Sequence, residues 1–231
     1  MEESIKTVMV VSPHPDDAEI CAGGTIALWC KQGREVFYVI CTNGDKGSSD
    51  PNMTSETLAK IRQQEQIEAS KILGVSNVTF LGYPDGGLED TPAFRGELVR
   101  LIRKHRPEVV LTTDPYRKYL WHRDHRITGI VTMDAIFPYA RDHLSYPEQI
   151  VEGLKPHKVK EIYFWGSEES DTFIDVEETF TVKLSALSCH VSQVGQYGDL
   201  LKQHIEERAS KAGQSQGVPL AEAFRRIEII Y

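Results

Sequence analysis

The strongest constraint on the fold is a regular alternation of short apolar runs, rich in β-branched residues, with longer stretches of helical periodicity. The runs typical of buried strands are residues 7–12, 35–41, 78–81, 108–113 and 160–165. The stretches typical of helices are residues 22–31, 55–73, 93–105 and 125–140. Such alternation is typical of βαβ units. We therefore predict an α/β fold, with a Rossmann-like, open, mainly parallel sheet and helices on both faces.

The last third of the sequence has a weaker pattern. It predicts a strand near 172–176, helices near 180–191 and 199–212, and a closing strand in RIEIIY at 226–231. A chain of 231 residues with 40% apolar residues is long enough to bury one sizeable core. We predict a single domain over residues 1–231, with a βα core over about 1–140 and a C-terminal part over about 141–231 that closes the pocket.

Charge and composition exclude several classes of protein. The net charge of −8 gives no basic footprint for nucleic acid, and every apolar run is soon broken by charge. The four cysteines have no paired spacing, so neither a cysteine zinc knot nor a disulfide scaffold is expected. We expect a cytoplasmic protein that binds neither nucleic acid nor a membrane.

The first chemical motif is PHPDDAE at 13–19, directly after the first predicted strand. A nucleotide-binding protein of this fold would carry glycines here, so that phosphates approach the amides of a helix end. Two carboxylates repel phosphate and attract a cation instead. His14 and Asp17 lie three positions apart at the start of a helix, so both can converge on one ion while Asp16 points elsewhere.

The second motif, WHRDH at 121–125, follows the fourth predicted strand and adds His122, Asp124 and His125 as candidates. The carboxyl ends of parallel strands share one edge of the sheet, so we expect the two motifs to meet. The alternative is an ordinary turn in which Asp16 or Asp17 caps a helix. The second His/Asp cluster at a matching strand end favours a metal site.

Two histidines and one carboxylate suit zinc and leave a coordination position open for water. Zinc lowers the pKa of bound water from about 15.7 to about 7 and polarises a carbonyl, and amide hydrolysis requires both effects. Asp16, beside the metal, is expected to take a proton from the attacking water. His122 is expected to stabilise the oxyanion and protonate the leaving amine. Asp124 is expected to orient either His122 or a metal-bound ring.

The two motifs together resemble the LmbE-like or PIG-L family of zinc-dependent N-acetylglucosaminyl deacetylases. The resemblance covers most of the chain, including the segments GGTIALWCKQG, RQQEQIEASKILGV and KLSALSCHVSQ. It implies one zinc ion per chain held by His14, Asp17 and His125, although these ligands also accept other divalent transition metals. It further implies that Asp16 is the general base and that His122 is the acid or oxyanion donor. The family commonly has proline where this chain has Arg123.

Three residues are candidates for substrate binding, each with a structural alternative. Arg62 either reaches the substrate, steadied by Glu65, or forms an ordinary ion pair with Glu65 one turn away on the same predicted helix. Asp114 either lines a sugar site or starts a turn. His190 is placed near the pocket by the family resemblance, whereas a lone helical histidine is more often a packed residue.

The function predicted from the sequence is a zinc-dependent N-deacetylase that hydrolyses the acetamide of an N-acetylglucosamine-type sugar or conjugate. Its products would be acetate and a free amine, its partner a small amino sugar, and its assembly state compatible with a homo-oligomer. The close alternative is a metal-dependent amidase acting on a thiol-conjugated pseudo-sugar or another small amide. A phosphoesterase would require two metals. A sugar-binding protein without catalysis is disfavoured by Asp16 and His122.

Overall fold

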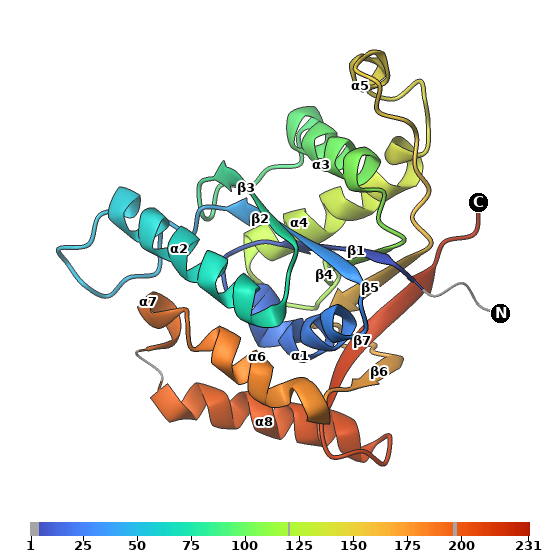
Figure 1. The fold of residues 1–231 in the computed structure, drawn as a ribbon. Coiled ribbons are helices and arrows are strands. Elements are labelled where there is room, and N and C mark those ends of the chain that lie inside the picture. Colours follow the sequence, from blue (N-terminus) through green and yellow to red (C-terminus); the bar gives the residue numbers. More distant parts are fainter. Residues whose placement is uncertain (1–4, 120, 196–197) are drawn as a thin grey trace.

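The computed structural model describes residues 5–119, 121–195 and 198–231. One seven-stranded sheet, in the order β3-β2-β1-β4-β5-β7-β6, runs through the molecule (Figure 1). The strands are β1 (Thr7–Ser12), β2 (Glu35–Thr42), β3 (Asn77–Tyr83), β4 (Val109–Thr113), β5 (Glu161–Trp165), β6 (Thr172–Asp175) and β7 (Ala221–Glu228). The predicted Rossmann-like, mainly parallel sheet is confirmed.

The helices connect the strands and cover both faces of the sheet. They are α1 (Asp17–Lys31), α2 (Ser55–Leu73), α3 (Pro92–His105), α4 (Arg123–Asp134), α5 (Pro147–Val151), α6 (Phe180–Leu187), α7 (Val191–Val194) and α8 (Gly198–Gln214), with a π-helical turn η1 (Ala135–Ala140) and a 3-10 turn η2 (Glu177–Thr179). Within the described ranges, none of these helices combines the length and apolarity needed to cross a lipid bilayer.

The chain changes direction across the sheet between β1 and β4. From β1 it proceeds to β2 and then β3, and it returns through α3 to place β4 on the free side of β1. β1 therefore pairs in parallel with both neighbours, Thr7 opposite Glu35 of β2 and Val8 opposite Val109 of β4. The loops that follow β1 and β4 diverge at this switch point, where open α/β sheets bind their ligands.

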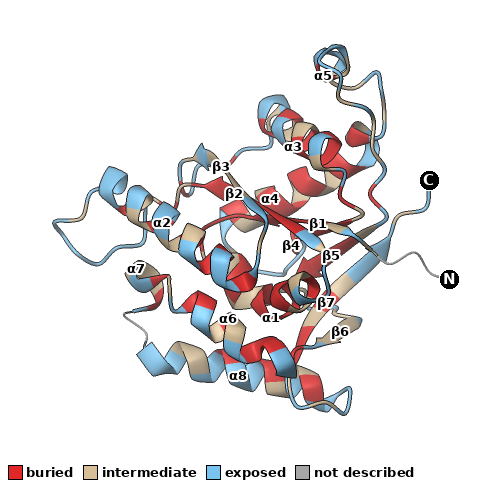
Figure 2. Cartoon of the chain, in the orientation of Figure 1, coloured by how far each residue is buried: buried red, intermediate tan, exposed pale blue. Residues whose placement is uncertain are grey.

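Alternate residues of β1 enter two different cores. Val8 and Val10 pack into a cluster that also contains residues of α1, α2 and α6. Met9 and Val11 point to the other face, into a cluster formed with α3, α4 and η1. Figure 2 shows the central strands and α1 in the colour of buried residues. A parallel strand buried on both faces accounts for the nearly continuous apolar run in this part of the sequence.

The last elements of the chain, from α6 onward, attach to the α1 side of the sheet through α6 and β7. β7 runs antiparallel to both β5 and β6, and its Glu222 is buried against α1. The Glu222 carboxylate accepts hydrogen bonds from the backbone amides of Gly24 (3.0 Å) and Thr25 (2.7 Å), and it pairs with Lys183 of α6. One buried carboxylate thus joins β7, α1 and α6.

Three predicted helix limits were wrong. α1 begins at Asp17 rather than at residue 22, because Asp17 and Glu19 favour the first turn of a helix, where the dipole is positive. The helix expected at 125–140 stops being regular at Asp134, since Pro138 has no backbone amide to donate and Phe137 leaves the helical conformation. The helix expected at 180–191 ends at Leu187, so His190 lies between α6 and α7.

The buried pair formed by Lys183 and Glu222 yields a prediction about stability. Lys183→Met should lower the free energy of unfolding by about 3–5 kcal/mol, because it leaves the Glu222 carboxylate buried without its cation. Lys31→Met is the matched control, since Lys31 pairs with Glu178 at the exposed surface and should contribute at most about 1 kcal/mol. Urea unfolding of both variants measures the difference. Equal losses would contradict the role given to Glu222.

Candidate metal and active site

The loop between β1 and α1 presents the first motif in a strained conformation. Asp16 has a φ of 98°, in the left-handed region that favours glycine. Its backbone amide donates to Gln66 Oε1 of α2 at 3.1 Å. The Asp16 side chain makes no capping hydrogen bond to α1, so the alternative of a simple helix cap does not hold for this residue.

The ring of His14 lies among three carboxylates. Its Nδ1 is 3.0 Å from Asp17 Oδ2, and its Nε2 is 3.1 Å from both Asp85 Oδ1 and Asp124 Oδ2. His125 Nε2 lies 3.1 Å from the same Asp17 oxygen. The structure therefore brings the two expected histidines together around the expected aspartate.

Electrostatic effects around this ring are strong. Burial would lower the pKa of His14, but its contacts with Asp124, Asp17 and Asp85 outweigh burial and raise that pKa well above the ordinary value. Burial would raise the pKa of Asp17, yet His125 and His14 hold it well below its usual range. The centre thus carries more carboxylate charge than the described histidines neutralise at neutral pH, which favours a bound cation.

The donor atoms suit a metal ion. In two groups of side chains, one ligand-type atom from each residue lies within 4.8 Å of all the others. The groups are His14, His122 and His125, and His14, Asp85, His122 and Asp124. They share His14 and His122, so they describe one centre rather than two. The buried Nδ1 of His125 has no hydrogen-bond partner among the described residues. Imidazole nitrogens and carboxylate oxygens together suit zinc.

Asp124 orients the ring of His14. It is fully buried, and its carboxylate accepts from the amides of Gly86 (2.6 Å) and Leu88 (3.1 Å) while touching His14 Nε2. The sequence left open whether Asp124 holds His122 or a metal-bound ring, and the contact is with His14. A carboxylate contact of this kind fixes the orientation of a histidine ring.

Asp85 was missed by the sequence analysis. It lies in the loop after β3, at the same edge of the sheet, and its Oδ1 touches His14 Nε2. Its own amide donates to Asp45 Oδ1 at 3.0 Å, which fixes the loop. The segment Pro84-Asp85-Gly86-Gly87 looks like an ordinary turn. The one sequence signal that marks Asp85 as a candidate site residue is its position directly after a strand of the parallel sheet.

His122 occupies the N-cap of α4 and is the most solvent-facing group of the centre, with 46% of its side chain exposed. Its Nδ1 accepts a hydrogen bond from the Asp124 amide at 3.1 Å, so the ring proton of the neutral form lies on Nε2. Burial, together with His14 and His125, lowers the pKa of His122. The lowered pKa favours the neutral ring, whose Nε2 lies 3.8 Å from Asp85 Oδ1.

The carboxylates of Asp16 and of the predicted ligand Asp17 belong to neither of the two groups, and that of Asp16 faces Arg62. Asp16 Oδ2 is 3.3 Å from Arg62 Nη2, and the same guanidinium donates to the carbonyls of Pro15 (2.7 Å) and Gly44 (3.1 Å). Burial and the neighbouring Asp17 raise the pKa of Asp16 to about 6, although Arg62 acts in the opposite direction. Arg62 thus ties the loop between β1 and α1 to the loop after β2.

The three candidate substrate contacts are all buried. Arg62 is 4% exposed and faces Asp16. Glu65 instead accepts hydrogen bonds from the amide and hydroxyl of Ser192, so the alternative of an Arg62–Glu65 ion pair was wrong.

The other two candidates are Asp114 and His190. The Asp114 carboxylate accepts a hydrogen bond from the Tyr116 amide at 2.8 Å, as the turn alternative required. His190 is 0% exposed, beside Glu19. The contacts of all three candidates with a substrate stay predictions, and the burial of His190 does not favour a direct one.

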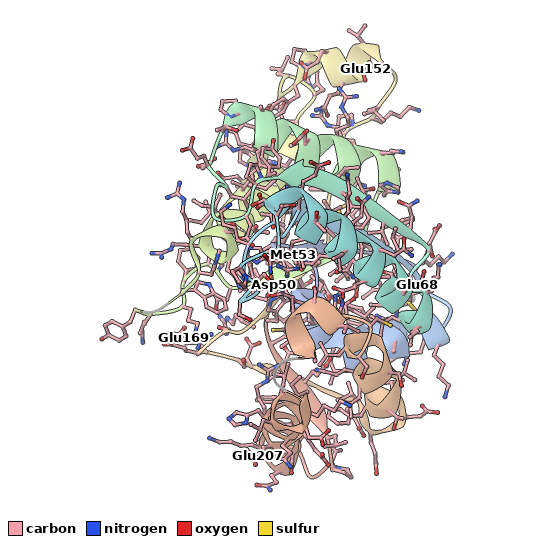
Figure 3. The ribbon with its side chains drawn as sticks, turned by 90° about the vertical axis from the view of Figure 1, so that its left-hand side faces the viewer. Asp50, Met53, Glu68, Glu152, Glu169 and Glu207 are labelled. Carbon is pink, nitrogen blue, oxygen red and sulfur yellow. The ribbon has the colours of Figure 1, made fainter. Side chains whose placement is uncertain are left out.

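Figure 3 looks onto the side of the molecule where the loop between β2 and α2 projects, with Asp50 and Met53 near the middle of the view. The loops after β1 and β2 emerge at this edge. Glu68 marks α2 on one side of them, and Glu207 marks α8 below.

The comparisons with known proteins agree with this geometry. Residues 9–136 match the family model described as PIG-L: GlcNAc-PI de-N-acetylase. The chain belongs to the PIG-L family. The diacetylchitobiose deacetylase of Thermococcus kodakarensis is 32% identical, over 98% of this chain and 85% of its own length. The mycothiol S-conjugate amidase of Streptomyces coelicolor is 36% identical, over 61% of this chain and 55% of its own.

The similarity extends to solved structures. The N,N'-diacetylchitobiose deacetylase from Pyrococcus horikoshii, complexed with its inhibitor MPG, superposes with a TM-score of 0.91 at 29% identity. The match covers 97% of this chain and 85% of that one. The PIG-L resemblance of the sequence is therefore confirmed over nearly the whole chain.

The hydrogen bond at His122 Nδ1 leads to a spectroscopic prediction. Nitrogen NMR of the imidazole should report His122 as neutral at pH 7 and in the Nε2–H tautomer, because the Asp124 amide occupies Nδ1. The spectrum of His122→Gln assigns the signal. A protonated Nδ1, or a pKa above the ordinary histidine value, would contradict this assignment.

Proposed function

We propose that this PIG-L protein is a zinc-dependent N-deacetylase that hydrolyses the acetamide of an N-acetylglucosamine-type sugar or conjugate. The observation that carries the proposal is the convergence of His14 and His125 on Asp17, with Asp16 beside this cluster but outside it. Metal ligands and a separate base are the two elements that hydrolysis of an unactivated amide requires. Membership of a family with deacetylase and amidase members supports the same reaction class.

His14, Asp17 and His125 are the proposed zinc ligands, and the same donors accept other divalent transition metals. When bound, zinc acidifies water and withdraws electrons from an amide carbonyl. Asp124 keeps the His14 ring in place through its contact with Nε2. Asp85 adds a further carboxylate whose charge favours a cation at the same centre.

Asp16 is the proposed group that moves the proton. A pKa of about 6 suits a base that must be mostly ionised at neutral pH yet able to hold a proton during the reaction. The attacking water would give its proton to the Asp16 carboxylate. Protonated Asp16 would then donate to the nitrogen of the leaving amine.

His122 is proposed as a hydrogen-bond donor to the carbonyl oxygen as negative charge develops on it. Its Nε2–H is available for this, since the Asp124 amide already occupies Nδ1. Donation to a developing oxyanion stabilises the transition state more than the substrate. The motif also predicts that His122 protonates the amine, but a neutral ring with one N–H is better suited to donating a hydrogen bond.

Amidase activity on a thiol-conjugated pseudo-sugar is the second candidate, and the mycothiol S-conjugate amidase relative favours it. The two activities break the same kind of bond in different substrates. Acetate release from N-acetylglucosamine derivatives, measured beside amine release from acylated pseudo-sugar conjugates, separates them. A phosphoesterase is disfavoured, because the two ligand groups among the described residues overlap in one centre.

Substitution of Asp16 and of His14 should have different consequences. Asp16→Ala should retain zinc but lower kcat by about 10²–10⁴-fold, the usual contribution of a general base. His14→Ala should lose both zinc and turnover, because it removes a ligand. Metal analysis of purified protein, combined with acetate release from N-acetylglucosamine derivatives, tests both. Full activity in Asp16→Ala would eliminate the proposed base.

Asp124→Ala should weaken zinc binding by about 10–100-fold, the usual effect of removing a carboxylate that orients a ligand histidine. Competition with a chelator measures the affinity. Asp175→Ala is a suitable control, because Asp175 is an exposed residue at the end of β6 that only accepts from the nearby Glu177 amide. Unchanged zinc affinity in Asp124→Ala would show that the His14 ring needs no such support.

A further inference from the structure

A chain of buried polar contacts lies behind Asp16, outside the proposed metal ligands. The Asp16 amide donates to Gln66 Oε1 at 3.1 Å, and Gln66 Nε2 donates to Glu19 Oε1 at 2.9 Å. The second Glu19 oxygen, Oε2, lies 3.5 Å from His190 Nε2. Glu19, Gln66 and His190 are each 0% exposed.

His190 is the cationic partner of Glu19, and Tyr38 also interacts with this carboxylate. A buried carboxylate is costly unless a cation or several donors compensate it. Gln66 donates to Oε1, whereas Oε2 and both ring nitrogens of His190 make no close hydrogen bond with the part of the chain that the structure describes. At 3.5 Å these two groups form an ion pair rather than a tight hydrogen bond. Burial would lower the pKa of His190, but Glu19, with Asp16 and Glu65, outweighs burial and raises it.

Asp16 needs support from its surroundings. A non-glycine residue with positive φ is strained, and such strain persists only where neighbouring contacts hold it. The hydrogen bond from the Asp16 amide to Gln66 is one such contact. Arg62 provides another through the Pro15 carbonyl and the Asp16 carboxylate.

We propose that His190 is a positioning residue for the reaction: by pairing with Glu19 it fixes Gln66, and Gln66 fixes the backbone and hence the carboxylate of Asp16. This inference rests on the proposed role of Asp16 as the base. It gives the segment His190-Val191-Ser192-Gln193 a function other than contact with substrate. Ser192, in the same segment, ties α7 to Glu65 of α2.

The primary test compares His190→Gln with wild type, both full-length and loaded with zinc, in the acetate-release assay. A displaced Asp16 should lower kcat by about 10²-fold, as misplacement of a catalytic group does, while KM and zinc content stay unchanged. A structural role alone would lower stability without this selective loss of kcat. Wild-type kcat in His190→Gln, or a parallel loss of kcat and zinc, overturns the proposal.

Ser192→Ala is the matched control. It breaks a contact of the same segment, but with Glu65 instead of Glu19. Its kcat should equal that of wild type, even if its melting temperature falls. If Ser192→Ala lost as much kcat as His190→Gln, any loosening of this segment would be sufficient to lower kcat. The specific path through Glu19 would then be refuted.

A double variant tests the coupling between the two ends of the pair. Glu19→Gln and His190→Gln each leave one buried charge without its partner, whereas the combined variant leaves two neutral amides able to hydrogen bond. The double variant should therefore have a higher kcat than the product of the two single losses predicts. Multiplicative losses would show that the two residues act independently, against the proposal.

Two other results need to be considered: a His190→Gln variant that does not fold, and a wild-type protein that is inactive. If His190→Gln does not fold, Gln66→Leu breaks the same path at its middle and should show the same selective loss of kcat; wild-type kcat there overturns the proposal. If wild type with zinc releases neither acetate nor amine from any substrate, the proposed function fails and this inference with it. If wild type is active and His190→Gln has the same kcat, the proposed function stands and only the inference about His190 is refuted.

Discussion

The parallel pairing of β1 with β4 is the constraint on which the rest of the site depends. Val11 lies opposite Thr112 in the register of the two strands, and the Thr112 hydroxyl donates to the Val11 carbonyl. Two loops therefore start side by side and turn toward the same edge, although His14 and Asp124 are 110 positions apart in the sequence. Backbone hydrogen bonds in the middle of the sheet thus bring the two loops together. Strands buried on both faces hold the first residues of these loops, and contacts with Gln66 and Arg62 hold the strained backbone at Asp16.

The centre is organised by an excess of negative charge. Asp17, Asp85 and Asp124 surround one imidazole, and Asp16 stands next to them, with Arg62 as its nearby cation. Carboxylates collected in a small buried volume raise one another's free energy unless a cation joins them. The same crowding shifts the pKa values of two of these carboxyl groups in opposite directions. Asp17, between two histidines, is held ionised, whereas Asp16, buried and beside Asp17, binds a proton more readily.

The sequence predicted most strands and both motifs well, because apolar runs and clusters of ligand-type residues are local signals. It placed the closing strand at 226–231, whereas β7 runs from Ala221 to Glu228. It did not predict the polar part of the inner face of α2. The buried residues of this helix include Arg62 and Gln66, whose partners lie on other elements. Apolar periodicity gives no signal for a polar side chain that is buried against partners distant in the sequence. Asp85 escaped for a related reason: its partner His14 is distant in sequence and its own neighbours form a common turn.

The bonds from Glu222 to α1 have a consequence for the order in which the molecule can assemble. This side chain receives the Gly24 amide from a point 198 positions earlier in the chain, and His190 reaches Glu19 from nearly as late. During ribosomal synthesis the first motif emerges early, whereas the contacts that support α1 form only after His190 and then Glu222 have been made. The nascent chain therefore exposes the side chains of the PHPDDAE motif before the groups that hold them in place exist.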